Sequence, residues 1–368
     1  MALSDIARKI ERASNSAALR RSTRKGWVPK LSGYAGYGNT EFVHVLGRVL
    51  MHDPESAENE TWAQRGYRQF FTIQVANHDV SVTVNGKTVT GHTNYNGYVD
   101  ILVHDHGLEA GWHEVTIDAA GAEPITAEVL IVSEDSPLGV VSDIDDTVMV
   151  TWLPRAMTAA WNSWVKRTNT RQPVEGMAGF YQELRAKHPD MPFIYLSTGA
   201  WNTYDTLVAF MENNDFPKGP LLLTDWGPTP TGLFRNGQEH KRVQLRNLFI
   251  AFPWMKWLLI GDDGQHDPLT YGDAANEHPD RVAAVAIRNL SPQEQLLSHG
   301  SLAPLADANE EGSFSIPLIQ GENGQSLAAK MRGIEPEITN EVYGPGAEAG
   351  EHCGLKQNKG LGFLSEES

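Results

Sequence analysis

Two aspartates separated by one residue, Asp143 and Asp145, follow a short apolar run at residues 138–141. Side chains alternate along an extended chain, so the two carboxylates share a face if the strand continues through them. Both could then contact one metal ion or one phosphorus atom. An acidic turn, in which Asp side chains bond their own backbone, is an equal alternative from this stretch alone. The rest of the chain has to decide between the two.

Further polar residues follow other apolar runs or open a helix: Ser197, Thr198, Lys241, Asp262, Asp263 and Asp267. Such an assortment suits phosphoryl transfer, because the charge of a phosphomonoester must be neutralised by a metal and a cation, and its oxygens must be held by hydroxyl and amide donors. Carboxylates are the hard oxygen ligands that magnesium prefers. One carboxylate can also act as a covalent nucleophile, and a second can move the protons.

The elements that must position these residues begin at Ser136, where apolar runs of strand length alternate with helical patterns. We predict strands at 140–141, 193–196, 221–224, 257–260 and 282–287, with helices at 152–167, 176–187, 201–212 and 240–249. This alternation is typical of an α/β domain with a doubly wound parallel sheet, which places ligands at the carboxyl ends of its strands. Each polar residue above lies at such an end or opens a helix beside one. We therefore expect them to converge on one crevice.

The part of the chain before Ser136 has a different sequence pattern, that of short strands. Runs rich in Val, Ile, Thr and aromatic residues predict an antiparallel β-sandwich with strands at 42–50, 67–76, 80–85, 87–90, 98–104, 112–118 and 125–132. His104 and His106 flank Asp105, but spacing alone does not define a metal site. We favour polar strand-end residues there.

Composition restricts the class of protein. The chain has 368 residues, a formal net charge of -16 and one cysteine, Cys353. The negative charge argues against a nucleic-acid partner, because affinity for the phosphate backbone comes from Lys and Arg. One cysteine excludes an intramolecular disulfide framework, and no run of signal-peptide or membrane-span length stands out. We expect a cytoplasmic location.

Residues 1–26 predict a basic helical segment with apolar residues at 3, 6, 10, 13 and 17. Such a helix can lie on an anionic membrane surface, which would make the protein peripheral there. A helix packed on its own protein is the alternative that we favour. The remaining divisions that we expect are a β-sandwich domain at 27–135, a catalytic domain at 136–333 and a flexible acidic tail at 334–368.

Four sequence motifs, in order, resemble the haloacid dehalogenase (HAD) superfamily of aspartyl-phosphate phosphatases. They are D-I-D-D-T at 143–147, Y-L-S-T at 195–198, Lys241 before L-L-I-G-D-D-G-Q-H-D at 258–267, and I-R-N-L at 287–290. The longer stretches V-S-D-I-D-D-T-V, P-V-E-G-M-A and F-P-K-G-P-L-L-L look like the actin-patch type of phosphatidate phosphatase. The resemblance implies a HAD-like fold and hydrolysis of a phosphomonoester, with phosphatidate as the leading substrate and diacylglycerol as its product.

By that resemblance Asp143 is the expected nucleophile and Asp145 the general acid and base. Lys241 would neutralise the charge of the nucleophile and the phosphate. Ser197 and Thr198, with nearby backbone amides, would hold the phosphoryl oxygens.

The resemblance also implies Mg²⁺ as cofactor. Its expected ligands are Asp143, Asp145 through the backbone carbonyl, Asp262 directly and Asp267 as an outer-sphere partner. Thr147 would steady the loop. The chain departs from the family at Asp263, where Ser is frequent, and at Gly199-Ala200, where Ser-Pro is frequent. These departures add charge beside the metal and alter the phosphate loop.

Two alternatives remain open at this point: a phosphatase for a soluble or protein-borne phosphomonoester, and a non-catalytic membrane or protein adaptor. An adaptor needs none of the reactive residues. Trp152, Trp161, Trp164 and Trp201 could form an apolar mouth for acyl chains, although packing on the core is the interpretation that we favour. Arg155, near the first motif, could meet a phosphate or a headgroup.

Overall fold

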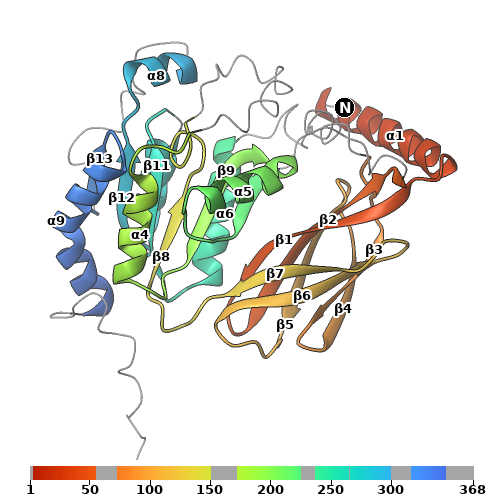
Figure 1. Cartoon of the computed structure of the whole chain (residues 1–368), viewed down its shortest axis with the longest axis horizontal. Helices are drawn as coiled ribbons and strands as arrows, with labels where there is room; N and C mark the ends of the chain where they lie inside the picture. Colours follow the sequence, from red (N-terminus) through yellow and green to blue (C-terminus); the bar gives the residue numbers. More distant parts are fainter. Residues whose placement is uncertain are drawn as a thin grey trace, which may run out of the picture.

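The computed structural model describes residues 3–54, 73–150, 172–224, 237–264, 266–299 and 316–344. Figure 1 shows two sheets side by side, one built from the first part of the chain and one from the later part, with helices around the second. The predicted helix at 152–167, with Trp152, Arg155, Trp161 and Trp164, lies outside the described residues, as does Cys353.

The first sheet has seven strands: β1 Val28–Gly38, β2 Phe42–His52, β3 Asp79–Val84, β4 Lys87–His92, β5 Tyr98–His104, β6 Gly111–Ala119 and β7 Ile125–Ile131. Their order is β4-β3-β6-β7-β1-β2-β5. The pairs are antiparallel except β1 with β7, which is parallel. The predicted purely antiparallel sandwich is therefore corrected to one mixed sheet. Its two edge strands approach each other around a valine-rich core.

Strand β1 covers a Gly- and Tyr-rich stretch that has no β-branched pattern to predict it. Its glycines have a packing reason. A Cβ at Gly36 would lie 2.1 Å from the carbonyl oxygen of His44, and one at Gly38 would lie 2.1 Å from that of Phe42. Only glycine permits β2 to approach β1 so closely. The predicted strand at 67–76 lies mostly outside the described residues; within it Gln74 forms a bridge to Leu50.

The second sheet confirms the predicted α/β class. Its strands are β8 Leu138–Ser142, β9 Phe193–Ala200, β10 Leu221–Thr224, β11 Lys256–Asp262, β12 Val282–Arg288 and β13 Leu318–Gly321. They run in the order β10-β9-β8-β11-β12-β13, and every neighbouring pair is parallel. Since these strands are buried on both faces, they are almost continuously apolar.

Helices pack on both faces of the second sheet. One core includes residues of α4 Met177–Lys187, α5 Tyr204–Asn213 and α9 Gly324–Tyr343. The opposite core includes residues of α6 Gly237–Ala251 and α7 Asp267–Glu277. A short 3-10 turn at Trp201–Thr203 precedes α5, and α8 spans Pro292–His299. The predicted helices at 176–187 and 240–249 correspond to α4 and α6.

Helix α9 continues ten residues past Gly333, into the segment predicted to be a flexible tail. Ile338 and Thr339 are buried in this extension. His188, which follows α4, stacks on Tyr343 with ring centroids 5.6 Å apart. These contacts order a sequence whose polar composition alone suggested no structure, so the predicted tail is wrong for residues 334–343.

Helix α1, Leu3–Arg24, begins the chain. Its Asn15 side chain donates to the carbonyl oxygen of Gln74 at 2.9 Å, and Leu19 packs against the core of the first sheet. Ser22 is buried on the same side, whereas Arg20 and Arg21 are exposed. The described half of α1 thus packs on its own protein. In the described part of the chain, we find no helix long and apolar enough to cross a membrane.

Candidate active site

Lys241 joins two aspartates from different elements at the carboxyl ends of the parallel strands. Its Nζ donates to Asp143 Oδ1 at 2.7 Å and to Asp267 Oδ1 at 2.5 Å, and all three side chains are buried. Asp143 follows β8, Lys241 lies in the second turn of α6, and Asp267 begins α7. The strand-end argument therefore brought together residues that are 98 and 26 positions apart.

Asp262, the last residue of β11, completes an acidic cluster. Carboxylate oxygens of Asp143, Asp262 and Asp267, one from each residue, lie within 4.8 Å of one another. Asp143 Oδ2, Asp262 Oδ1 and Asp267 Oδ2 are buried and have no hydrogen-bond partner among the described residues. Three buried carboxylates this close together, each with an oxygen that lacks a partner, fit a hard divalent cation, which would compensate their burial. Asp267, expected as an outer-sphere partner, lies within the cluster.

A glycine makes room for this cluster. A Cβ at Gly261 would lie 2.5 Å from Asp267 Oδ2, so any other residue there would displace the carboxylate. The glycine immediately before Asp262 therefore permits the ends of β11 and α7 to approach. No signal in the sequence distinguished it from an ordinary strand glycine.

The electrostatics agree with a site that needs a cation. Burial raises the pKa of Asp143 well above its usual range, and the neighbouring Asp267 and Asp145 raise it further, while Lys241 opposes the shift. Burial likewise raises the pKa of Asp262, together with Asp267 and Asp143. Burial alone would lower the pKa of Lys241, but the carboxylates of Asp143 and Asp267 raise it instead. One lysine does not compensate three buried carboxylates.

Asp145 points toward the end of β9 and is absent from the acidic cluster. Ser197 Oγ donates to Asp145 Oδ2 at 3.0 Å and accepts from the backbone N–H of Gly199 at 2.8 Å. The Thr198 side chain is half-buried, and the backbone carbonyl oxygen of Thr198 accepts from Thr224 Oγ1 at 2.9 Å. Of the predicted phosphate-binding pair, Ser197 is thus the one whose hydroxyl meets the predicted acid and base.

The loop that carries these aspartates is fixed by residues that have no reactive role. Asp146 has φ 60°, in the left-handed region, which turns the chain after Asp145. Thr147 Oγ1 lies 3.5 Å from Asp262 Oδ2, a long contact. Ser142 Oγ donates to the carbonyl oxygen of Asp143 at 2.6 Å and lies 2.6 Å from the Tyr181 hydroxyl.

Arg288 is the residue of this site to which the sequence assigned no role. Its Nη1 donates to the carbonyl oxygen of Asp146 at 2.7 Å, its Nη2 to Glu294 at 2.7 Å and its Nε to the carbonyl oxygen of Glu322 at 3.2 Å. The arginine ends β12 and lies within the I-R-N-L motif. Its position at a strand end was the available signal.

Asp263 is not among the three carboxylates of the acidic cluster. Its Oδ1 accepts from the backbone N–H of Leu290 at 2.8 Å, and Gln295 Nε2 lies 3.5 Å from Oδ2. The carboxylate therefore holds the segment after β12. The effect of this negative charge on a metal stays a prediction, and the structure adds that the carboxylate makes a local backbone contact.

The His104–His106 segment has no features of a metal site. His106 is buried, with Nε2 2.9 Å from the carbonyl oxygen of Asn39 and Nδ1 accepting from the N–H of Leu108 at 3.0 Å. Both ring nitrogens are thereby occupied, and the side chain ties two loops of the first sheet.

A buried acidic cluster, one lysine and a hydroxyl lie together at the carboxyl ends of a parallel sheet, an arrangement that suits phosphoryl transfer. Residues 138–289 match the family described as phosphatidate phosphatase APP1, catalytic domain. The match agrees with the resemblance that the motifs of this segment predicted.

Two relatives show how far the similarity extends. Phosphatidate phosphatase APP1 of Saccharomyces cerevisiae is 27% identical over 170 residues, which are 45% of this chain and 28% of that protein. An uncharacterised protein of Schizosaccharomyces pombe is 20% identical over 290 residues, 73% of this chain and 47% of that protein. The chain therefore spans less than half the length of either relative.

Among solved structures, the HAD domain of effector protein Lem4 from Legionella pneumophila is similar to this chain at 16% identity. The match covers 42% of this chain and 87% of that one, with a TM-score of 0.28.

Proposed function

We propose that this protein is a magnesium-dependent phosphatase with a HAD-like, doubly wound catalytic domain that hydrolyses a phosphomonoester through an aspartyl phosphate on Asp143. The observation that carries the proposal is the set of three buried carboxylates, each with an orphaned oxygen, around Lys241. A non-catalytic adaptor needs no such set, and burying it without a function is costly.

The cofactor would be held by Asp143, Asp262 and Asp267. When bound, Mg²⁺ supplies positive charge that offsets the phosphoryl group and the carboxylates. The backbone carbonyl of Asp145 is a further proposed ligand.

In the first step a carboxylate oxygen of Asp143 attacks phosphorus, and the ester P–O bond breaks. Lys241 holds Asp143 by Oδ1 and keeps the carboxylate oriented. Asp145, in its protonated form, gives its proton to the leaving alkoxide, and Ser197 Oγ keeps Asp145 at the phosphate loop. Ser197, Thr198 and nearby amides bind the phosphoryl oxygens.

In the second step Asp145, now a carboxylate, takes a proton from water. The water oxygen attacks phosphorus, the bond to Asp143 breaks, and inorganic phosphate leaves. Both aspartates return to their starting protonation states.

Phosphatidate is the substrate that we propose, with diacylglycerol as the product. The family match of residues 138–289 supports it. A soluble or protein-borne phosphomonoester is the second candidate, because the roles proposed for the residues around Asp143 concern the phosphoryl group and not the alcohol. Nucleic acid is no proposed partner, because the net charge of -16 opposes it.

We further infer a cytoplasmic protein that touches the membrane surface through α1. The exposed Arg20, Arg21, Arg24 and Lys25 support this inference, because basic side chains attract anionic lipids. Removal of residues 1–25 should then weaken sedimentation with anionic liposomes. Unchanged sedimentation would leave α1 as a packing element alone.

The decisive experiment compares phosphate release from phosphatidate in mixed micelles with release from a panel of soluble phosphomonoesters, each with and without Mg²⁺. We expect phosphatidate to be preferred and chelation to abolish release. A wide preference for soluble esters would overturn the phosphatidate assignment and favour a soluble or protein-borne phosphomonoester as the substrate. Asp143→Asn serves as the inactive control.

A further inference from the structure

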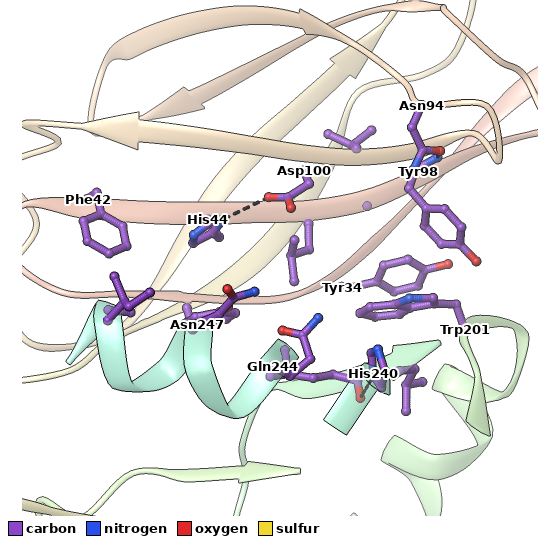
Figure 2. A pocket seen from close by; sticks show the side chains of 18 residues that line it. Tyr34, Phe42, His44, Asn94, Tyr98, Asp100, Trp201, His240, Gln244 and Asn247 are labelled. Carbon is purple, nitrogen blue, oxygen red and sulfur yellow. Dashed lines mark hydrogen bonds and ion pairs between the residues drawn. The ribbon is translucent and has the colours of Figure 1, made fainter. Parts of the chain in front are cut away.

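A cleft of about 440 Å³ lies between the first sheet and helix α6 (Figure 2). Small-molecule sites have this size and often lie at such domain boundaries. Asp143, Asp145, Lys241 and Asp262 do not line it. The cleft is therefore separate from the candidate active site, and its chemistry has to be derived from its own walls.

The two long walls present polar groups to each other. Gln244 and Asn247, one turn apart on α6, point into the cleft from one side. On the other side His44 Nδ1 lies 2.9 Å from Asp100 Oδ1, which fixes the orientation of the imidazole. Neither carboxamide makes a side-chain hydrogen bond to any residue within the described ranges. Each carboxamide offers both donors and an acceptor, as a hydroxyl group requires.

The lining disfavours an anion. Among the described residues that line the cleft there is no Lys or Arg. Phosphate and carboxylate ligands are recognised by those cations. Asp100 faces the cleft instead, so an anion would meet repulsion there.

The lining also disfavours an organic cation and an acyl chain. Tyr34 stacks on Trp201 with centroids 4.6 Å apart and lies 4.7 Å from the Tyr204 ring, while the guanidinium of Arg48 lies 4.3 Å from the centroid of the Tyr98 ring. These aromatic faces are already in contact, so they form no cage for a cation. An acyl chain would remove water from the carboxamides without replacing their hydrogen bonds.

We propose that this cleft binds an uncharged, hydroxyl-rich group, a polyol or a sugar ring, either free or as the headgroup of a lipid. Gln244 and Asn247 bind its hydroxyls from α6, and the His44–Asp100 pair binds them from the first sheet. Trp201 forms one end of the cleft and follows Ala200, the last residue of the strand that carries Ser197. Occupancy should therefore change the fluorescence of Trp201.

The test titrates the full chain with myo-inositol and with glucose by calorimetry. Vesicles of phosphatidylcholine with and without phosphatidylinositol distinguish a lipid headgroup from a free polyol. Inorganic phosphate, choline and hexanoate are the charged and apolar comparison probes. Gln244→Leu and Asn247→Leu keep most of the side-chain volume but remove the amide groups. Arg246→Leu is the matched control, because it lies on the same helix and does not line the cleft.

We expect saturable binding of at least one hydroxyl-rich probe, weakened about tenfold in Gln244→Leu and Asn247→Leu, as the loss of one hydrogen bond requires. Arg246→Leu should bind normally. A Trp201→Phe variant should lose the fluorescence change. Asp143→Asn should bind normally too, so failure of the phosphatase proposal leaves this one intact. Absence of binding by every hydroxyl-rich probe, equal binding in the leucine variants and the control, or preference for a charged or apolar probe would overturn it.

Discussion

The guanidinium of Arg288 donates from Nη1 to the carbonyl oxygen of Asp146 at 2.7 Å, across 142 residues of chain. Asp146 is the left-handed residue that turns the loop of Asp143 and Asp145, and Arg288 also binds Glu294 on α8. The end of β12 therefore supports the backbone on which Asp143 and Asp145 depend. Arg288 is a positioning residue in this description, because it contacts only the backbone of the loop.

We expect Arg288→Met to lower kcat while leaving KM for an aryl phosphate nearly unchanged. The buried carbonyl of Asp146 would lose its partner, which costs about 1–3 kcal/mol of folding free energy. Arg332→Met is the control, since that arginine pairs with Glu183 at the surface. Steady-state kinetics and urea denaturation measure the two effects. Unchanged kcat in a destabilised Arg288→Met protein would show that the contact is structural only.

We expect Asp143→Asn to abolish hydrolysis of an aryl phosphate while the protein stays folded, because the amide is a poor nucleophile. Asp263→Asn should retain most activity, since Asp263 binds the backbone of Leu290 and does not face the cluster. The two variants remove the same charge near the same strand ends. Circular dichroism confirms folding, and phosphate release gives the activity. Full activity in Asp143→Asn, or loss in both variants alike, would contradict the assignment.

Mg²⁺ should raise the melting temperature of the protein, because a ligand that binds only the folded state stabilises it by mass action. The increase should disappear in Asp262→Asn, which removes a negative charge and a ligand oxygen from the cluster. Differential scanning calorimetry with and without Mg²⁺ measures this independently of turnover. Asp273→Asn, on the exposed face of α7, is the control. If Mg²⁺ raised the melting temperature of both variants equally, the metal would bind at a different site.

Tyr204 of α5 links this helix to strand β1 of the first sheet, since its hydroxyl accepts from the backbone N–H of Ala35 at 2.7 Å. Burial raises the pKa of Tyr204 to about 12, so the hydroxyl stays protonated at neutral pH. Tyr204→Phe should lower the free energy of unfolding by about 1 kcal/mol, the usual net contribution of one such hydrogen bond. Tyr95→Phe, at an exposed site, should cost less. Urea denaturation of both variants makes the comparison, and equal effects would mean that this bond is not important.

His188 should make stability pH-dependent. Burial lowers the pKa of His188 below its ordinary 6.5, although Glu335 opposes the shift. Below pH 6.5 the unfolded chain binds this proton more readily than the folded protein. The free energy of unfolding therefore falls as the pH decreases from 6.5 to the folded pKa, and His188→Phe should remove that part of the slope. An identical slope in the variant would refute the assignment.

The α/β class and strands β8 to β12 of the second sheet follow from the sequence alone, because buried parallel strands require continuous apolar runs. The sequence also placed Asp143, Lys241, Asp262 and Asp267 together, since the carboxyl ends of parallel strands share one edge. These inferences needed only periodicity and chain order. The match of residues 138–289 to a known family adds to them and agrees with them.

The direction of each side chain, by contrast, depends on the tertiary structure. Asp145 turns toward Ser197 and Asp263 toward Leu290, although both neighbour cluster residues in sequence. Their directions depend on the backbone conformation of the loops, for example on the positive φ of Asp146. Loop conformation leaves no periodic pattern in the sequence. Likewise β1 exists because its glycines permit close contact with β2, and α9 extends because partners distant in sequence bury its last turns. Such features depend on what lies opposite a residue, and a single sequence does not record that.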